Sequence, residues 1–319
     1  MAVYTHVDSA ILSGFLARYD VGEAVSFKGI AEGVENTNYL LETTKARFIL
    51  TLYEKRANPD DLPYFLGIME HLAQKGLPAP LPIRDKKGNA LQMLAGRPAC
   101  MISFLKGVSV TQLEESHCAA LGSTLATMHN ALLDYSPERI NDMALSGWTK
   151  LASATKDHAD AVMPGLQALI DDELAFLHEN WPSGLPTGTI HADLFPDNIL
   201  FKDTEITGVI DFYFGCTDML AYDLAICLNA WCFDIEHVFE APKAKRLIEM
   251  YDIVRSLTPA EQDALPVLCR GAALRFLLTR LYDWLNPVEG ASVNAKDPAD
   301  YVKRLKFHQQ VKDTASYVV

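Results

Sequence analysis

The first third of the chain alternates short apolar runs with glycine-containing turns, which is the pattern of an antiparallel β-sheet. Three early runs are expected to be strands, at residues 25–30, 38–42 and 48–53. A helix with periodic apolar positions is expected to begin after Asp60 and Asp61 and to end at Gly76. A further apolar strand is expected at residues 98–105. The pattern predicts a small sheet with one helix packed on it, and a hinge at the last strand.

Beyond this strand the apolar positions follow helical spacing. Thr111 with Glu114 three residues later predicts a capping box at the start of a helix. The same signature returns at residues 258–261, where a proline occupies the first helical position. The polar stretch 286–300 is expected to be a surface loop before the last helix.

These patterns predict an α+β chain with two lobes. Residues 1–105 would form a small antiparallel-sheet lobe, and residues 106–319 a larger, mainly helical lobe.

Composition narrows the class of protein. The chain has 319 residues, 49% of them apolar, which is enough to fill sizeable cores. A net charge of −13 argues against a nucleic-acid partner. The six cysteines show neither a paired motif nor a metal-site spacing, so buried thiols are expected. We also expect no signal peptide and no membrane span, which together favour a cytoplasmic protein.

One polar loop carries a set of side chains suited to phosphoryl transfer. The loop begins at His191, contains Asp193 and reaches Asn198 five residues later, and the next strand, 206–210, leads into Asp211. Phosphoryl transfer requires a carboxylate that orients the attacking hydroxyl and accepts its proton, and oxygen ligands for Mg²⁺ on the phosphates of ATP. Asp193 fits the first role, and Asn198 and Asp211 fit the second. A polar turn would explain each residue alone, but not the ordered set at this spacing.

At these residues the sequence resembles the aminoglycoside phosphotransferase and choline kinase superfamily, and within it the homoserine kinases. The segments that carry the resemblance are residues 191–198, 33–39 and 274–283. Ala192 stands where the superfamily usually has glycine. The resemblance implies a protein-kinase-like fold, a nucleotide-binding first lobe, and a second lobe for catalysis and substrate. It also implies ATP and Mg²⁺ as cofactors and L-homoserine, a precursor of threonine, as the acceptor.

The resemblance also implies roles for particular residues. Asp193 would be the catalytic base, His191 would fix its loop, and Asn198 and Asp211 would bind Mg²⁺. Asp223 matches an aspartate that anchors the core near the site, and an N-cap of a helix at residues 224–231 is an equally good interpretation.

The predicted nucleotide site includes the hairpin at residues 29–42, which resembles the hairpin that covers the ATP phosphates in this superfamily. The candidate nucleotide ligands are Gly33, Asn36, Asn38, Met101 and Ser103. Kinases of this fold usually pair a strand lysine with a helix glutamate. Here Thr51 and Phe65 occupy those two places, so Arg47, Lys55 or Arg56 would have to reach the phosphates.

The acceptor's α-carboxylate requires a cation. Arg275 and Arg280 lie in an apolar helical segment and are candidates, with Arg275 favoured. A structural ion pair with Asp283 or another acid is the simpler interpretation of either arginine. Tyr213 and Asn38 are expected to line the acceptor pocket, although an aromatic residue there is as often part of a core.

Three alternatives stay open at this stage. The acceptor could be choline, an aminoglycoside, hydroxylysine or a sugar, and residue chemistry alone does not decide between them. A nucleotide-binding pseudokinase is suggested by Thr51 but disfavoured because Asp193, Asn198 and Asp211 are all present. A protein kinase is disfavoured because no Ala-Pro-Glu segment follows Asp211. The sequence does not fix the oligomeric state.

Overall fold

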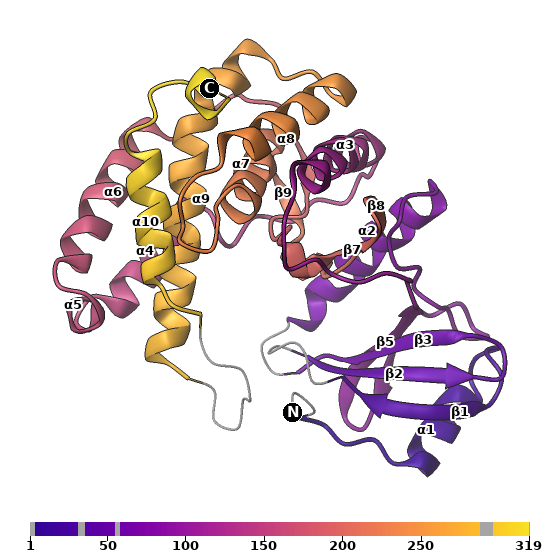
Figure 1. Cartoon of the computed structure of the whole chain (residues 1–319). Helices are drawn as coiled ribbons and strands as arrows, with labels where there is room; N and C mark the ends of the chain where they lie inside the picture. The colour runs from indigo at the N-terminus through magenta and orange to yellow at the C-terminus, as the bar shows by residue number, and fades with distance from the viewer. Residues whose placement is uncertain (1–3, 31–35, 55–57, 288–295, 319) are drawn as a thin grey trace. The chain divides into compact units, whose positions relative to one another are not determined.

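The computed structural model describes residues 4–30, 36–54, 58–287 and 296–318. The chain divides into two compact units, whose elements are labelled in Figure 1. The first comprises the described residues up to Gly107 together with Thr207–Tyr213. The second comprises Val108–Ile206 and the described residues from Phe214 onward. None of the described helices has the length and apolar character needed to cross a membrane.

A five-stranded antiparallel sheet forms the centre of the first unit, in the order β1-β2-β3-β5-β4. The strands are β1 (Ala24–Gly29), β2 (Thr37–Thr43), β3 (Arg47–Leu52), β4 (Leu91–Leu94) and β5 (Arg97–Ser103). Side chains along β2 alternate between buried and half-buried, the two-residue period of a strand with one face in a core. The four strands predicted for this sheet are confirmed, with every end within two residues of the expected one.

The helices of the first unit are α1 (Ser9–Leu16) and α2 (Leu62–Gln74), the latter preceded by the 3₁₀ turn η1 (Pro59–Asp61). The chain leaves α2 at Gly76 with φ +78°, as predicted. Helix α1 was not predicted. The Asp8 side chain caps it by accepting the Ile11 N–H at 2.8 Å. Its buried Leu12 and Phe15 belong to the same core as the inner face of the sheet.

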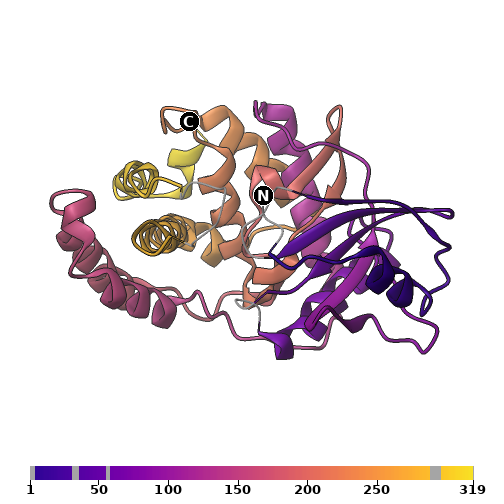
Figure 2. The same cartoon turned by 90° about the horizontal axis from the view of Figure 1, so that it is seen from below.

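The second unit is mainly helical, as predicted. Its helices are α3 (Glu115–Ala131), α4 (Leu145–Thr155), α5 (Ala159–Val162), α6 (Leu166–Asn180), α7 (Leu220–Trp231), α8 (Ala241–Val254), α9 (Pro259–Leu285) and α10 (Ala299–His308). Every residue of α7 is buried, so α7 is the central helix of this unit. Figure 2 looks along α9 and α10, which lie side by side. Helices α3 and α8 approach closely, because a Cβ added at Gly122 would lie 2.2 Å from the Leu247 carbonyl oxygen.

Short strands flank the loops that contain the predicted site residues. They are β6 (Thr187–Ile190), paired with β9 (Cys216–Met219), and β7 (Ile199–Lys202), paired with β8 (Glu205–Val209). Three further 3₁₀ turns are η2 (Pro196–Asn198), η3 (Phe212–Phe214) and η4 (Thr314–Tyr317). Of the polar stretch predicted as a loop, residues 288–295 lie outside the described residues.

The two predicted capping boxes have different outcomes. At α9 the Thr258 hydroxyl accepts the Glu261 N–H at 3.2 Å and the Glu261 carboxylate accepts the Thr258 N–H at 2.9 Å, which confirms the prediction. At α3 the prediction was wrong, because the N-cap is Glu114 and not Thr111. The imidazole Nδ1 of His117 accepts the Glu114 N–H at 3.1 Å and replaces the glutamate that the pattern requires.

All six cysteines are free and buried, as expected from the sequence. Burial raises the pKa of the Cys100, Cys216 and Cys269 thiols to about 12. The thiols are therefore parts of the two cores and not reactive groups.

Candidate active site

The predicted catalytic loop connects β6 to β7 and brings Asp193 and Asn198 together. The Asn198 side-chain nitrogen donates to the Asp193 backbone oxygen at 2.8 Å and to Asp193 Oδ2 at 3.3 Å. Asn198 is buried and Asp193 is half-buried. Because both contacts use the amide nitrogen, the amide oxygen is the atom that Asn198 could offer to a cation. The pair thus offers a carboxylate that can accept a proton and an amide oxygen that can bind a metal ion.

The backbone before Asp193 has an unusual conformation that the surrounding residues stabilise. Ala192 has φ +63°, in the left-handed region that a non-glycine residue rarely adopts. The N–H groups of His191 and Ala192 donate to the Asp223 carboxylate at 2.8 Å and 2.9 Å. The Asp193 N–H donates to the His191 ring at 3.3 Å, and the support role of His191 stays a prediction.

Asp223 corrects one of the two interpretations drawn from sequence. It does not cap a helix at residues 224–231, because α7 begins at Leu220 with Met219 as N-cap. Its carboxylate instead lies inside α7 and holds the catalytic loop. Burial acts to raise the pKa of Asp223, but its partners His129 and His191 outweigh it and lower the pKa. Asp223 is therefore ionised and accepts every hydrogen bond that it makes.

His129 was not identified from the sequence. Its Nε2 lies 3.2 Å from Asp223 Oδ2, and the imidazole is buried on α3. The two residues are distant in sequence, and a histidine at an apolar helix position is indistinguishable from ordinary core. The signal that could have pointed to His129 was Asp223, because a buried carboxylate needs a hydrogen-bond donor.

Arg275 is buried at the same loop. Its Nη1 donates to the Ala192 carbonyl oxygen at 2.5 Å, and its guanidinium lies 4.7 Å from the Phe276 ring centroid. Its Nε has no hydrogen-bond partner among the described residues. Its predicted contact with the acceptor stays a prediction. Arg280 instead pairs with Asp300 at 2.9 Å, which confirms the structural interpretation of that arginine.

Lys296 places a second cation at this loop. Its Nζ lies 3.6 Å from Asp197 Oδ2 and 5.5 Å from the centroid of the Phe195 ring. Lys296 was not predicted, because an isolated lysine in a polar stretch carries no sequence pattern.

Asp211 and Tyr213 belong to the first unit. Asp211 follows β8 with φ +66° and is exposed, and its role as a Mg²⁺ ligand stays a prediction. The Tyr213 hydroxyl accepts a hydrogen bond from Tyr53 at 3.2 Å, and its ring contacts Phe65 edge to face at 5.9 Å. Its predicted place in the acceptor pocket also stays a prediction.

The predicted nucleotide ligands lie on the sheet. Asn36 Oδ1 accepts the Glu54 N–H at 3.3 Å, and the Ser103 hydroxyl accepts the Leu81 N–H at 2.9 Å. Met101 is buried within the core of the first unit. Gly33 lies outside the described residues. These contacts lie within the first unit, and nucleotide binding by these residues stays a prediction.

The strand position of the usual kinase lysine is polar but uncharged. The Thr51 hydroxyl donates to Asn38 Oδ1 at 2.7 Å, and Thr51 is buried. Arg47 is paired with Glu42 at 3.4 Å. Lys55 and Arg56 lie outside the described residues.

A nearby ion pair was missed by the sequence analysis. Arg97, at the start of β5, lies 3.1 Å from Glu54, which follows β3. The first unit thus contains an ion pair at its sheet, but not at the positions of the strand lysine and helix glutamate that are usual in kinases of this fold.

In the described part of the chain, no group of three or more His, Cys, Asp or Glu side chains could hold a metal ion. The predicted Mg²⁺ ligands, Asn198 and Asp211, offer an amide oxygen and a carboxylate, the donor types that Mg²⁺ uses in kinases, and their role stays a prediction. The residues fit such an ion chemically.

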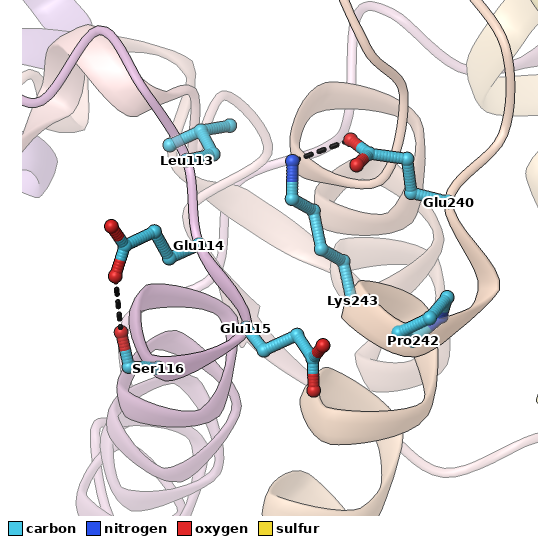
Figure 3. A pocket seen from close by; sticks show the side chains of 7 residues that line it. All are labelled: Leu113, Glu114, Glu115, Ser116, Glu240, Pro242 and Lys243. Atoms are coloured by element: carbon cyan, nitrogen blue, oxygen red, sulfur yellow. Dashed lines mark hydrogen bonds and ion pairs between the residues drawn. The ribbon is translucent and has the colours of Figure 1, made fainter.

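A separate cavity of about 460 Å³ lies in the second unit, at the N-terminal ends of α3 and α8 (Figure 3). It is lined by Leu113, Glu114, Glu115, Ser116, Glu240, Pro242 and Lys243. The Lys243 ammonium is paired with Glu240, and none of the predicted site residues lines the cavity.

Comparison with known proteins relates this geometry to a family. The model of the phosphotransferase enzyme family APH matches residues 26–257, more than half of the chain. Homoserine kinases of Allorhizobium ampelinum and Xanthobacter autotrophicus are 56% and 55% identical to the chain over 317 residues, covering 99% of each sequence.

Solved structures share the fold at low identity. An amicoumacin kinase in complex with AMP-PNP and Ca²⁺ superposes with a TM-score of 0.71 at 14% identity, covering 97% of this chain and 95% of its own. A microcompartment-associated aminopropanol kinase gives a TM-score of 0.66 at 18% identity, covering 98% and 99%.

Proposed function

The chain belongs to the homoserine kinase family of the APH phosphotransferases, and we propose from this that it phosphorylates the side-chain hydroxyl of L-homoserine with ATP. The observation that carries the proposal is full-length identity above one half to homoserine kinases, in a chain whose Asp193 and Asn198 are in contact. The product would be O-phospho-L-homoserine, which serves threonine biosynthesis. We expect the protein to act in the cytoplasm, where free thiols such as its six cysteines persist.

Asp193 supplies the proton chemistry in this proposal. Its carboxylate orients the acceptor hydroxyl and takes the proton while the hydroxyl oxygen bonds to the γ-phosphorus of ATP. The bond from that phosphorus to the β,γ-bridging oxygen breaks, and ADP leaves. His191 keeps the loop in place by accepting the Asp193 N–H.

Asn198 and Asp211 would supply the oxygen ligands of a Mg²⁺ ion, which neutralises charge on the transferred phosphoryl group when bound. Asn198 is suited to this because Asp193 engages its amide nitrogen and not its amide oxygen. Nucleotide would be bound by the first unit.

The cation for the α-carboxylate of L-homoserine is best sought between Arg275 and Lys296. Arg275 is buried and bonded to the Ala192 carbonyl, whereas the Lys296 side chain is 59% exposed. Comparing Arg275→Lys with Lys296→Met distinguishes them: the KM for L-homoserine should rise in the variant that has lost the carboxylate ligand. A lower kcat at unchanged KM would instead indicate support of the loop.

The proposal is tested by ADP release from Mg²⁺–ATP with L-homoserine, L-serine, L-threonine, choline, hydroxylysine and kanamycin as acceptors. L-homoserine should be the preferred acceptor. Asp193→Asn should lower kcat by about 10²- to 10⁴-fold, and Asp203→Asn, at an exposed position between β7 and β8, is the matched control. Preference for another acceptor would reject the substrate, and near-normal turnover in Asp193→Asn would reject the mechanism.

A further inference from the structure

A chain of polar groups continues from Asp223, on α7, to Arg255 at the C-terminal end of α8 and Glu261 in the first turn of α9. Beyond His129, the Tyr251 hydroxyl lies 2.8 Å from the imidazole Nδ1. Arg255 donates to the Tyr251 oxygen at 3.2 Å and to Glu261 at 2.9 Å. Tyr251, His129 and Glu261 are each at most 1% exposed. Such a network is maintained at a cost in desolvation, which is offset only when every member is paired.

With an uncharged His129, the donors and acceptors of this chain are compatible with one arrangement of hydrogens. Asp223 is ionised and accepts, so His129 must donate to it from Nε2. The other ring nitrogen then accepts, and Tyr251 donates to it. Burial raises the pKa of Tyr251, so the hydroxyl keeps the hydrogen that it donates. Its oxygen accepts from Arg255, which has only donors.

We infer that Tyr251 is a positioning residue for the phosphoryl transfer, acting through His129 and Asp223 on the backbone before Asp193. This inference rests on the proposed function. The last link of the chain ends on the Ala192 N–H, at a residue with φ +63°. A strained peptide beside the catalytic base stays in place only while its partners hold it. Without the Tyr251 hydroxyl, His129 has an unsatisfied Nδ1 and can turn, which loosens Asp223.

The same unit contains a matched control. Tyr317 and His308 form a second buried tyrosine–histidine pair, with the hydroxyl 2.9 Å from Nδ1. The Nε2 of His308 lies 3.2 Å from Asn229 Oδ1, so this pair ends on a helix side chain and not on the catalytic loop. The two pairs have the same chemistry and burial but different targets.

The test compares Tyr251→Phe with Tyr317→Phe in the full-length protein. Tyr251→Phe should lower kcat by about tenfold because the catalytic loop is misplaced, with KM for ATP within about twofold of wild type. Tyr317→Phe should leave kcat unchanged. Exchange of the Ala192 amide hydrogen should accelerate in Tyr251→Phe alone, a readout that general destabilisation would not produce. An unchanged kcat in Tyr251→Phe, or equal kcat losses in both variants, would overturn the inference.

A second measurement uses the wild-type protein alone, so it depends neither on the folding of a variant nor on an acceptor substrate. The ¹⁵N chemical shifts of His129 in the wild-type protein should show the hydrogen on Nε2 and a hydrogen-bonded, unprotonated Nδ1. Hydrogen on Nδ1 would contradict the chain of donors. Absence of turnover with L-homoserine in wild type would instead reject the proposed function, so the two failures are distinguishable.

Discussion

His308 gives the second unit a pH dependence whose size can be worked out from its surroundings. The imidazole is buried on α10 between Tyr317 and Asn229. Burial, together with the positive charges of Arg304 and Arg270, lowers the pKa of His308 to about 3. In an unfolded chain a histidine has a pKa of about 6.5.

Between these two values the unfolded state binds a proton that the folded state does not. The free energy of unfolding therefore rises with pH across this window and falls as the pH is lowered through it. From pH 7 to pH 5, His308 alone should remove about 2 kcal/mol. His308→Gln should abolish this dependence, although its stability at pH 7 should be lower because the hydrogen bond to Tyr317 is altered.

Urea unfolding at pH 7 and pH 5, followed by tryptophan fluorescence, measures this contribution. The second unit contains all four tryptophans, Trp148, Trp181, Trp231 and Trp284, so the signal reports on the unit that contains His308. His158→Gln, at an exposed histidine, is the control and should retain the wild-type dependence. If wild type and His308→Gln lost the same free energy of unfolding between the two pH values, the reasoning would be wrong.

Three further predictions concern other parts of the molecule. Asp223→Asn places an amide nitrogen against the loop's N–H donors and should lower the free energy of unfolding by about 3 kcal/mol, measured by urea titration. Gly122→Ala should lower the free energy of unfolding by about 1–3 kcal/mol, because α3 and α8 must separate. Gly14→Ala, where an added Cβ meets nothing within 4 Å, should raise it by about 0.5–1 kcal/mol. Calorimetry compares the two variants. Asp211→Asn should weaken binding of Mg²⁺–ATP, and unchanged calorimetric affinity would contradict its predicted role.

Much of the fold could be predicted because the signals for it are local. The two-residue alternation of strands such as Thr37–Thr43 follows directly from one buried face. The cap of α9 needs only Thr258, Pro259 and Glu261, which are neighbours in sequence. Helix α1 was missed although Asp8 and the spaced Leu12 and Phe15 carry the same kind of signal.

The site was predictable only as far as its residues lie in one loop. Asp193 and Asn198 are five residues apart, and the turn between them brings them into contact. Asp223 was interpreted as a possible helix cap because its partners are 31 and 32 residues away in the chain. The contact between His129 and Tyr251 spans 122 residues. Tertiary packing alone creates such pairs.

The burial of all six cysteines has a practical consequence for measuring motion in this protein. A maleimide dye reacts with exposed thiolates, so the folded native chain offers it no ready target. Cysteines introduced at exposed positions, such as Val25 in the first unit and Lys150 in the second, could carry a donor and an acceptor dye without removal of any native cysteine. Energy transfer between them would then measure the distance between the two units with and without nucleotide.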